Sequence, residues 1–251
     1  MNFFDFETAA QRYDQARPYF QPDVIEMIRS RLPFQAKVDA ALDVACGTGH
    51  STMALLNIAN TIVGTDLSNA MIAQATRHPA ISFQQAPAER LPFPDASFDL
   101  ITVCMAYHWF DQPRFLAEAK RLLTPNGALV VYNSYFPGVM EGNDQYQQAH
   151  ANYTSQFPTP ARSNKHPTQA DAGNVGLAGT TEPFEFWVEW NVAQLVDYLC
   201  SQSNVIGQVE CGHRDLGSIK TELRAQFGDC FNQPLERFLF RGDVSIWQVG
   251  E

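Results

Sequence analysis

Hydrophobic and polar positions along the chain switch between two periods, and this switching predicts the order of the elements. Short apolar runs, typical of buried parallel strands, recur in the first half of the chain. Between them lie stretches with the apolar spacing of helices. These patterns predict strands near 40–45, 61–65, 80–84, 99–104 and 127–133, and helices near 50–58, 69–76 and 112–123. Alternating strands and helices are typical of a parallel sheet with helices on both faces.

The two ends of the chain follow other patterns. Residues 1–37 look helical, with one amphipathic helix from Pro22 to Leu32 that Pro33 would stop. From Phe136 to Pro183 the periodicity is lost in a stretch rich in turn-forming residues, and so long a stretch in a compact domain is usually functional or disordered. Order returns as a strand at 184–190, helices at Val192–Ser203 and Ser218–Phe227, and one or two strands between Phe238 and Val249.

A glycine-rich turn joins the first two predicted strands. Gly47 and Gly49 flank Thr48 where strand gives way to helix, and glycine there permits a tight turn and a close approach of a ligand. The helix that follows has free N–H groups at its start, which favour an anionic group. The second strand delivers Asp66, whose carboxylate can accept both hydroxyls of a ribose. The pattern therefore predicts a site for an adenosine-containing ligand.

Two classes of ligand fit such a site. A nicotinamide or flavin dinucleotide requires three glycines in the turn, but Thr52 occupies the third position and Ala45 stands two residues before Gly47. Asp43, inside the first strand, would repel a pyrophosphate. It could instead face a cationic amino-acid tail, directly or through water. The residues by themselves favour S-adenosylmethionine over a dinucleotide without deciding the question.

A series of motifs extends the pattern along the chain. They are DVACGTG at 43–49, GTDLS at 64–68, AE at 88–89, LPFPDASFD at 91–99 and YHWFD at 107–111. In this order they resemble the class I S-adenosylmethionine-dependent methyltransferases, and most of all the type 11 small-molecule branch, which includes enzymes similar to trans-aconitate methyltransferases. Ala45 stands where that family usually has glycine, and its side chain is small enough to keep the backbone approach.

The resemblance implies a Rossmann-like α/β fold with a seven-stranded, mostly parallel sheet and helices on both faces. Four segments of one domain are then expected. They are an N-terminal helical cover (1–37), a donor-binding core (38–135), a lid or acceptor-site insertion (136–183) before the last two strands, and a C-terminal part (184–251) that completes the sheet.

The resemblance also implies which residues contact the methyl donor. RYDQARPYF resembles the Y-x-x-x-R-P-x-Y segment with which the family covers its cofactor, and the Arg17 fork could pair with the donor's carboxylate. Ser68 is the better helix cap by position, which leaves Asp66 for the ribose. The expected donor-binding residues are Tyr13, Arg17, Asp43, Ala45, Gly47, Gly49, Asp66, Leu67, Met71, Ala88, Glu89 and Met105.

Residues just past the fourth strand are expected at the methyl end of the donor, because ligands of open parallel sheets bind outside the carboxyl ends of the strands. His108 is the titratable group there, and it is a candidate general base. The alternative is that His108 and Trp109 only pack against the donor or the next helix. A carboxylate acceptor would need no base, whereas a hydroxyl or carbon acceptor would. Asp99, at the start of that strand, is expected to shape the sheet edge.

Composition narrows the class of protein. The 251 residues carry a net charge of −10, with 27 acids against 17 bases, which argues against a nucleic-acid substrate. Neither a membrane span nor a secretory signal is expected, and the five scattered cysteines favour a reducing compartment, so we expect a cytoplasmic protein without a metal site. The expected partner is a small-molecule methyl acceptor, and the oligomeric state stays open. The alternatives are a protein that binds the donor without turnover and, more remotely, a nicotinamide-dependent reductase.

Overall fold

The computed structural model describes residues 7–32, 34, 36–158 and 168–250. The chain forms two compact units, which the text calls the sheet unit and the helical unit. The sheet unit takes residues 19–134, 162–184 and 242–251, and the helical unit takes residues 1–18, 135–161 and 185–241. Both units are therefore built from segments far apart in the sequence, and they cut across the four consecutive segments that the sequence suggests.

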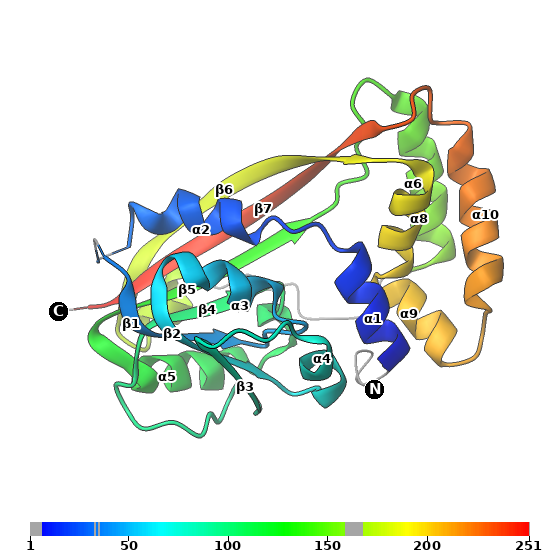
Figure 1. Ribbon diagram of the computed structural model, residues 1–251. Coiled ribbons are helices and arrows are strands. Elements are labelled where there is room, and N and C mark those ends of the chain that lie inside the picture. Colours follow the sequence, from blue (N-terminus) through cyan, green and yellow to red (C-terminus); the bar gives the residue numbers. More distant parts are fainter. Residues whose placement is uncertain (1–6, 33, 35, 159–167, 251) are drawn as a thin grey trace. The chain divides into compact units, whose positions relative to one another are not determined.

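The seven strands form one sheet in the order β3-β2-β1-β4-β5-β7-β6 (Figure 1). Strand β1 runs parallel to β2 and β4, β2 runs parallel to β3, and β4 runs parallel to β5. This confirms the expected fold class. The strands are β1 (Val38–Val44), β2 (Ala59–Asp66), β3 (Ile81–Gln85), β4 (Phe98–Cys104), β5 (Leu123–Tyr135), β6 (Leu177–Trp190) and β7 (Glu236–Val249).

The sheet unit holds helices as well as strands. These helices are α2 (Gln21–Arg29), α3 (His50–Ala54) with the 3-10 turn η1 (Leu55–Asn57), α4 (Asn69–Gln74), the 3-10 turn η2 (Tyr107–Trp109), α5 (Gln112–Leu122) and α7 (Gln169–Gly173). The helical unit holds α1 (Glu7–Ala16), α6 (Asp144–Gln156), α8 (Val192–Cys200), α9 (Ser203–Glu210) and α10 (Leu216–Gly228). None of the helices in the described part of the chain is long and apolar enough to cross a membrane.

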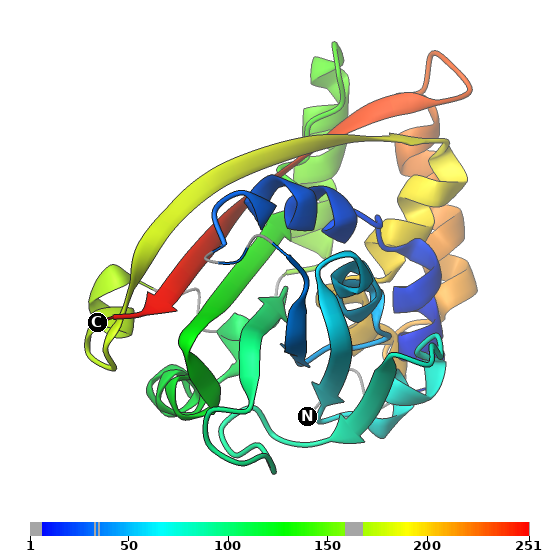
Figure 2. The ribbon, with the colours of Figure 1, turned by 60° about the vertical axis from the view of Figure 1, so that its left-hand side comes forward.

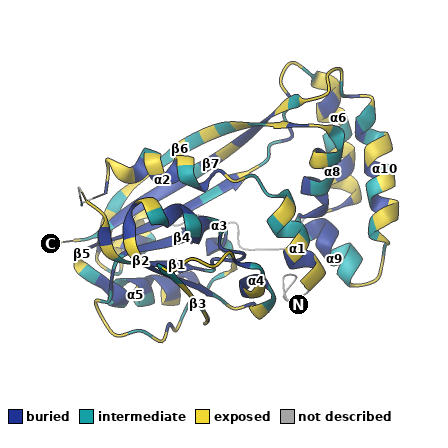
Figure 3. Cartoon of the chain, in the orientation of Figure 1, coloured by how far each residue is buried: buried dark blue, intermediate teal, exposed yellow. Residues whose placement is uncertain are grey.

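The carboxyl ends of the central strands are aligned by their register. Val44 of β1 pairs with Thr65 of β2 on one side and with Val103 of β4 on the other. Figure 2 shows these strands side by side, and Figure 3 shows that they are largely buried. The glycine turn follows β1, Asp66 is the last residue of β2, and Met105 follows β4. They therefore meet at one edge of the sheet, where open parallel sheets bind their ligands.

Asp99 organises the opposite edge of the sheet. Its carboxylate accepts the backbone N–H groups of Asp39 and Ala40, both at 3.2 Å, and the hydroxyl of Thr124 at 3.1 Å. It thereby ties the beginnings of β1, β4 and β5 together. The structural role expected for Asp99 is confirmed.

The expectation that residues 136–183 lack regular structure is wrong. They contain α6, α7 and the first half of β6. Most positions of α6 are polar, but Tyr146 and Tyr153 lie two helical turns apart and are fully buried in the core of the helical unit, together with Phe157. The rings of Tyr146 and Tyr153, with that of Phe157 just after the helix, form the apolar face of α6, which the mostly polar composition of the segment does not indicate. The lid and acceptor-site role of this segment stays a prediction.

Other boundaries also differ from the expectation. Helix α2 ends at Arg29, before Pro33, which lies outside the described residues. Strand β5 begins at Leu123, earlier than expected, and the segment from Phe238 is one strand that starts at Glu236. The pattern near 192–203 concealed a helix boundary at Cys200, after which α9 begins a second helix.

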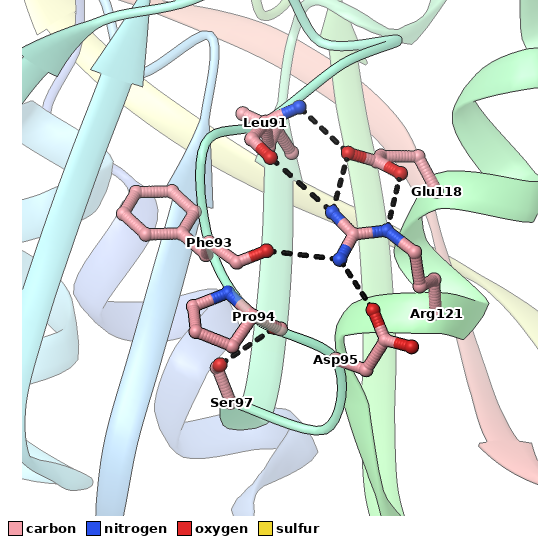
Figure 4. Close-up of polar contacts among 7 residues, drawn as sticks. All are labelled: Leu91, Phe93, Pro94, Asp95, Ser97, Glu118 and Arg121. Atoms are coloured by element: carbon pink, nitrogen blue, oxygen red, sulfur yellow. Dashed lines mark hydrogen bonds and ion pairs between the residues drawn. The ribbon is translucent and has the colours of Figure 1, made fainter.

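A loop between β3 and β4 carries the LPFPD motif and is held by one arginine of α5 (Figure 4). The Arg121 guanidinium donates to both carboxylate oxygens of Glu118 at 2.8 Å, to Asp95 at 2.7 Å, and to the carbonyls of Phe93 at 2.9 Å and Leu91 at 3.2 Å. Hydrogen bonding from Arg121 lowers the pKa of the Glu118 carboxyl, which itself accepts the N–H of Leu91 at 2.6 Å. The motif is therefore a structural loop anchored on α5.

Replacing Arg121 with alanine should destabilise the sheet unit by about 2–4 kcal/mol, because several charge-assisted hydrogen bonds are lost and the Glu118 carboxylate loses the cation that pairs with it. Arg121→Lys should recover only part of this, since an ammonium lacks the planar fork. Urea unfolding measures both. Arg114→Ala is the matched control on the same helix, because its exposed pair with Asp111 should contribute less than about 1 kcal/mol. Equal losses for Arg121→Ala and Arg114→Ala would contradict the anchoring role.

Candidate active site

The backbone of the glycine turn is left-handed at every second residue. The φ angles are 55° at Ala45, 57° at Gly47 and 86° at Gly49. The N–H of Cys46 donates to the carbonyl of Thr65, and the N–H of Gly49 donates to the carbonyl of Cys46, both at 2.9 Å. Ala45 holds its left-handed conformation at a cost of about 1–2 kcal/mol relative to glycine, which explains physically why glycine suits this position.

The Asp43 side chain points into the protein and stabilises the elements on either side of the glycine turn. Its side chain is fully buried, and its carboxylate accepts the hydroxyls of Ser51 and Thr52, both at 2.6 Å, and of Thr102 at 2.9 Å. Ser51 and Thr52 lie in the first turn of α3 and Thr102 lies in β4. Asp43 therefore joins β1, α3 and β4, and its role in binding the donor, directly or through water, stays a prediction.

Burial raises the pKa of Asp43 to about 6, although the three hydroxyl donors act in the opposite direction. The folded state therefore holds this proton more tightly than the unfolded chain, where the pKa is near 4. The stability that the proton contributes is present below pH 4 and is lost as the pH rises through about 6, by roughly 1.4 kcal/mol per pH unit inside that window.

Asp43→Asn should remove this dependence. The difference in unfolding free energy between Asp43→Asn and wild type should shift by about 2–3 kcal/mol in favour of the variant from pH 4 to pH 7. Urea unfolding across that range measures the difference. The contributions of the other carboxylates cancel in it, because both proteins carry them. A difference that stays constant with pH would show that Asp43 titrates normally.

Asp66 connects the glycine turn to the start of α4. One carboxylate oxygen accepts the N–H of Gly47 and the other accepts the N–H of Ser68, both at 2.8 Å. Ser68 caps α4 by accepting the N–H of Met71 at 3.3 Å, as expected from its position. Asp66 is half-buried. Through its two hydrogen bonds it shapes the turn in addition to any ligand contact.

The two glycines of the turn differ in what surrounds them. A Cβ atom at Gly47 would lie 3.1 Å from Cε of Met71, whose side chain is buried. A Cβ atom at Gly49 would lie 3.2 Å from Cζ of Phe83 and 3.3 Å from Cβ of Ala75. A side chain at Gly49 thus points into the packing of β3 and α4. The role of Gly49 in binding the donor stays a prediction.

Two neighbouring segments complete the donor side of the site. Leu67 follows Asp66 and is 57% exposed. Ala88 is buried in the core of the sheet unit. The carboxylate of Glu89 accepts the N–H of Asp111 at 2.8 Å, so it bridges to the beginning of α5. Sequence reasoning did not predict this bridge.

The end of β4 forms the other side of the site. Met105 has a left-handed φ of 59°, and its sulfur accepts the N–H of Ser134 at 2.9 Å. Burial raises the pKa of the neighbouring Cys104 to about 12, which makes that thiol unreactive at neutral pH. The left-handed backbone at Met105 changes the direction of the chain between β4 and the turn η2.

His108 and Trp109 lie in that turn. The His108 side chain is half-buried, Trp109 is 44% exposed, and their ring centroids are 4.8 Å apart. An accessible imidazole next to an exposed indole can either accept a proton or form an aromatic wall. The structure places both residues at the ligand edge of the sheet, as expected, and both roles of His108 stay predictions.

The segment RYDQARPYF is divided between the two units. Tyr19 belongs to the sheet unit, where its ring meets His50 of α3 edge-on with centroids 5.6 Å apart. Tyr13 and Arg17 belong to the helical unit, where the Arg17 guanidinium lies over the rings of Tyr13 and Tyr198 and donates to the carbonyl of Ser201 at 3.0 Å. The role of Tyr13 and Arg17 as a cover for the donor stays a prediction.

The residues at the ligand edge fit an adenosyl donor. Asp66 offers a carboxylate, Leu67 an exposed apolar side chain, and the turn a backbone that approaches closely. Two buried hydroxyls in this region, Thr48 Oγ1 and Thr65 Oγ1, have no hydrogen-bond partner within the protein, although buried polar groups normally have one. Across the described residues, no three His, Cys, Asp or Glu side chains gather as a metal site would require.

Comparisons with known proteins agree with this geometry. Residues 42–131 match the type 11 protein family described as "Methyltransferase domain". A putative methyltransferase from Dictyostelium discoideum is 26% identical over 223 residues, which cover 87% of this chain and 84% of that protein. A demethylmenaquinone methyltransferase from Beutenbergia cavernae is 34% identical over 136 residues, which cover 50% of this chain and 55% of that protein.

The fold has solved relatives as well. The structure of a putative type II methyltransferase from Anaeromyxobacter dehalogenans is similar with a TM-score of 0.66 and 23% identity, and the match covers 93% of this chain and 98% of that one. The family match spans the glycine turn, Asp66, the LPFPD loop and the turn that carries His108. Residues 42–131 therefore form a methyltransferase domain, and the chain has the fold and the sequence relatives of the class I S-adenosylmethionine-dependent methyltransferases.

Proposed function

We propose that this enzyme transfers the methyl group of S-adenosylmethionine to a small-molecule acceptor, at a carboxylate, a hydroxyl or a carbon atom. The observation that carries the donor half of the proposal is the left-handed glycine turn facing Asp66 at the carboxyl ends of β1 and β2. The net charge of −10 supports an acceptor that is not a nucleic acid. One relative is named for demethylmenaquinone, a small-molecule acceptor.

The donor supplies a methyl group on a sulfonium, and the protein supplies binding and orientation. Asp66 would accept the ribose hydroxyls, Leu67 would pack against the adenine, and the backbone around Gly47 would hold the amino-acid tail. Asp43 would keep the turn in shape through its three hydroxyl partners. Met71 and Ala88 are buried, and Met105, which follows β4, would lie on the methyl side of the donor.

The acceptor would bind beside the turn that carries His108 and Trp109. An already ionised carboxylate would need only orientation, with the two rings as a wall. A hydroxyl or an acidic carbon would lose a proton, which the neutral imidazole of His108 could accept. The chemical class of the acceptor therefore decides what His108 does.

Calorimetry and mass spectrometry together test the proposal. S-adenosylmethionine and S-adenosylhomocysteine should bind to the isolated protein, and NAD should not. Incubation of a mixture of small metabolites with methyl-labelled donor should then yield a product that is heavier by one labelled methyl group. Binding without any labelled product across carboxylate, hydroxyl and carbon acceptors would favour a protein that holds the donor without turnover. Binding of NAD alone would refute the donor assignment.

A further inference from the structure

The carboxylate of Glu89 links the loop after β3 to the beginning of α5. Its Oε1 atom accepts the N–H of Asp111 at 2.8 Å. Asp111 caps α5 and follows the turn of His108 and Trp109 with only Phe110 between them. A negative charge is favourable at the N-terminus of a helix, and a carboxylate that accepts a backbone N–H forms one of the stronger hydrogen bonds of a protein. The bond therefore connects the two sides of the ligand edge.

The far end of the same loop is held by the same helix. Glu118 accepts the N–H of Leu91, and Arg121 donates to the carbonyls of Leu91 and Phe93 (Figure 4). Ala88, Leu91 and Tyr107 share one hydrophobic cluster with the buried face of α5. The loop is thus attached to α5 by polar contacts at both ends and by apolar packing between them. A displacement of the loop must move the start of α5.

We propose that Glu89 is a positioning residue that couples donor binding at the Ala88–Glu89 loop to the turn that carries His108 and Trp109. The inference rests on the proposed function, because it assumes that the donor's adenosyl part lies against this loop. It replaces the expectation that Glu89 binds the donor itself, because one carboxylate oxygen already accepts the N–H of Asp111. When the donor orders the Ala88–Glu89 loop, the hydrogen bond from Asp111 to Glu89 also orders the turn of His108 and Trp109.

Hydrogen exchange measured by mass spectrometry tests the coupling without any knowledge of the acceptor. S-adenosylhomocysteine serves as the probe, with wild type, Glu89→Ala and Glu89→Gln. In wild type the probe should slow exchange in peptides covering 43–50, 64–72 and 104–112. Glu89→Gln keeps an oxygen that can accept the N–H of Asp111, so it should behave like wild type. Glu89→Ala should bind the probe with protection at 43–50 and 64–72 but not at 104–112.

The protein without ligand gives an independent measurement. Exchange at 104–112 should be about tenfold faster in Glu89→Ala than in wild type, because a charge-assisted hydrogen bond is lost. Glu26→Ala is the control, since Glu26 is exposed and pairs only loosely with Arg29 at 3.7 Å.

Each other outcome overturns the inference in a recognisable way. Wild-type protection of 104–112 in Glu89→Ala would show that the bond carries no coupling. Loss of probe binding in both Glu89 variants, with normal exchange in the ligand-free protein, would restore direct contact with the adenine. Failure of wild type itself to bind the probe would refute the proposed function, and the coupling with it.

Discussion

Replacing Asp66 with alanine should weaken binding of S-adenosylhomocysteine by about 10²–10⁴-fold. Two charge-assisted hydrogen bonds to the ribose would be lost, each contributing about 1.5–3 kcal/mol before compensation. The glycine turn would also loosen, because the N–H groups of Gly47 and Ser68 lose the carboxylate that they now share at 2.8 Å. Isothermal titration calorimetry measures the affinity directly.

The matched control for Asp66→Ala is Asp39→Ala. Asp39 is an exposed aspartate on the same unit, but it lies at the beginning of β1, away from the carboxyl ends of the strands. Its replacement should leave donor affinity unchanged. Asp66→Asn should fall between wild type and Asp66→Ala, since the amide oxygen can still accept one N–H. Unchanged affinity in Asp66→Ala, with the fold intact by circular dichroism, would remove Asp66 from the site.

The parts of the site that the sequence predicts are those fixed by local chain geometry. Apolar runs identify β1 and β2, and paired glycines after a strand indicate a left-handed turn, so Gly47 and Gly49 could be located without coordinates. Register then brings Asp66 to the same edge as the turn. Ser68 as the cap of α4 also follows from residue type and position alone.

The directions of side chains could not be predicted in the same way. Asp43 was expected to face the ligand, yet it turns inward because Ser51, Thr52 and Thr102 offer three hydroxyls from two other elements. Two of these hydroxyls begin α3, and a pair of hydroxyl residues in the first turn after such a strand is a signal that could have been used. The third comes from β4, and only its register with β1 reveals it.

The helical unit was harder to predict because its core is aromatic and spread along the sequence. Rings from α6, α8, β7 and the residue that follows β5 meet there, among them Phe136, Tyr153, Tyr198 and Phe240. A tyrosine surrounded by glutamine and asparagine looks like part of a polar segment until its partners, which lie tens of residues away, are known. Local periodicity therefore identifies the sheet unit well and the helical unit poorly.

Gly49→Val should cost the sheet unit about 2–5 kcal/mol of folding free energy, and loss of donor binding should follow from that damage. A left-handed φ of 86° is strained for a residue with a Cβ, by about 1–2 kcal/mol. The added atoms would also press on Phe83 and Ala75, and such overpacking costs about 1–3 kcal/mol. Thermal and urea unfolding measure the sum.

Two further variants separate the strain from the contact. Gly142 has a φ of 66° with nothing within 4 Å of an added Cβ, so Gly142→Val should cost only about 1–2 kcal/mol for the backbone. Adding Phe83→Leu to Gly49→Val should recover part of the loss at Gly49, because a smaller side chain leaves room for the valine. A Gly49→Val protein with wild-type stability but no affinity for S-adenosylhomocysteine would show instead that a side chain at this position points toward the donor.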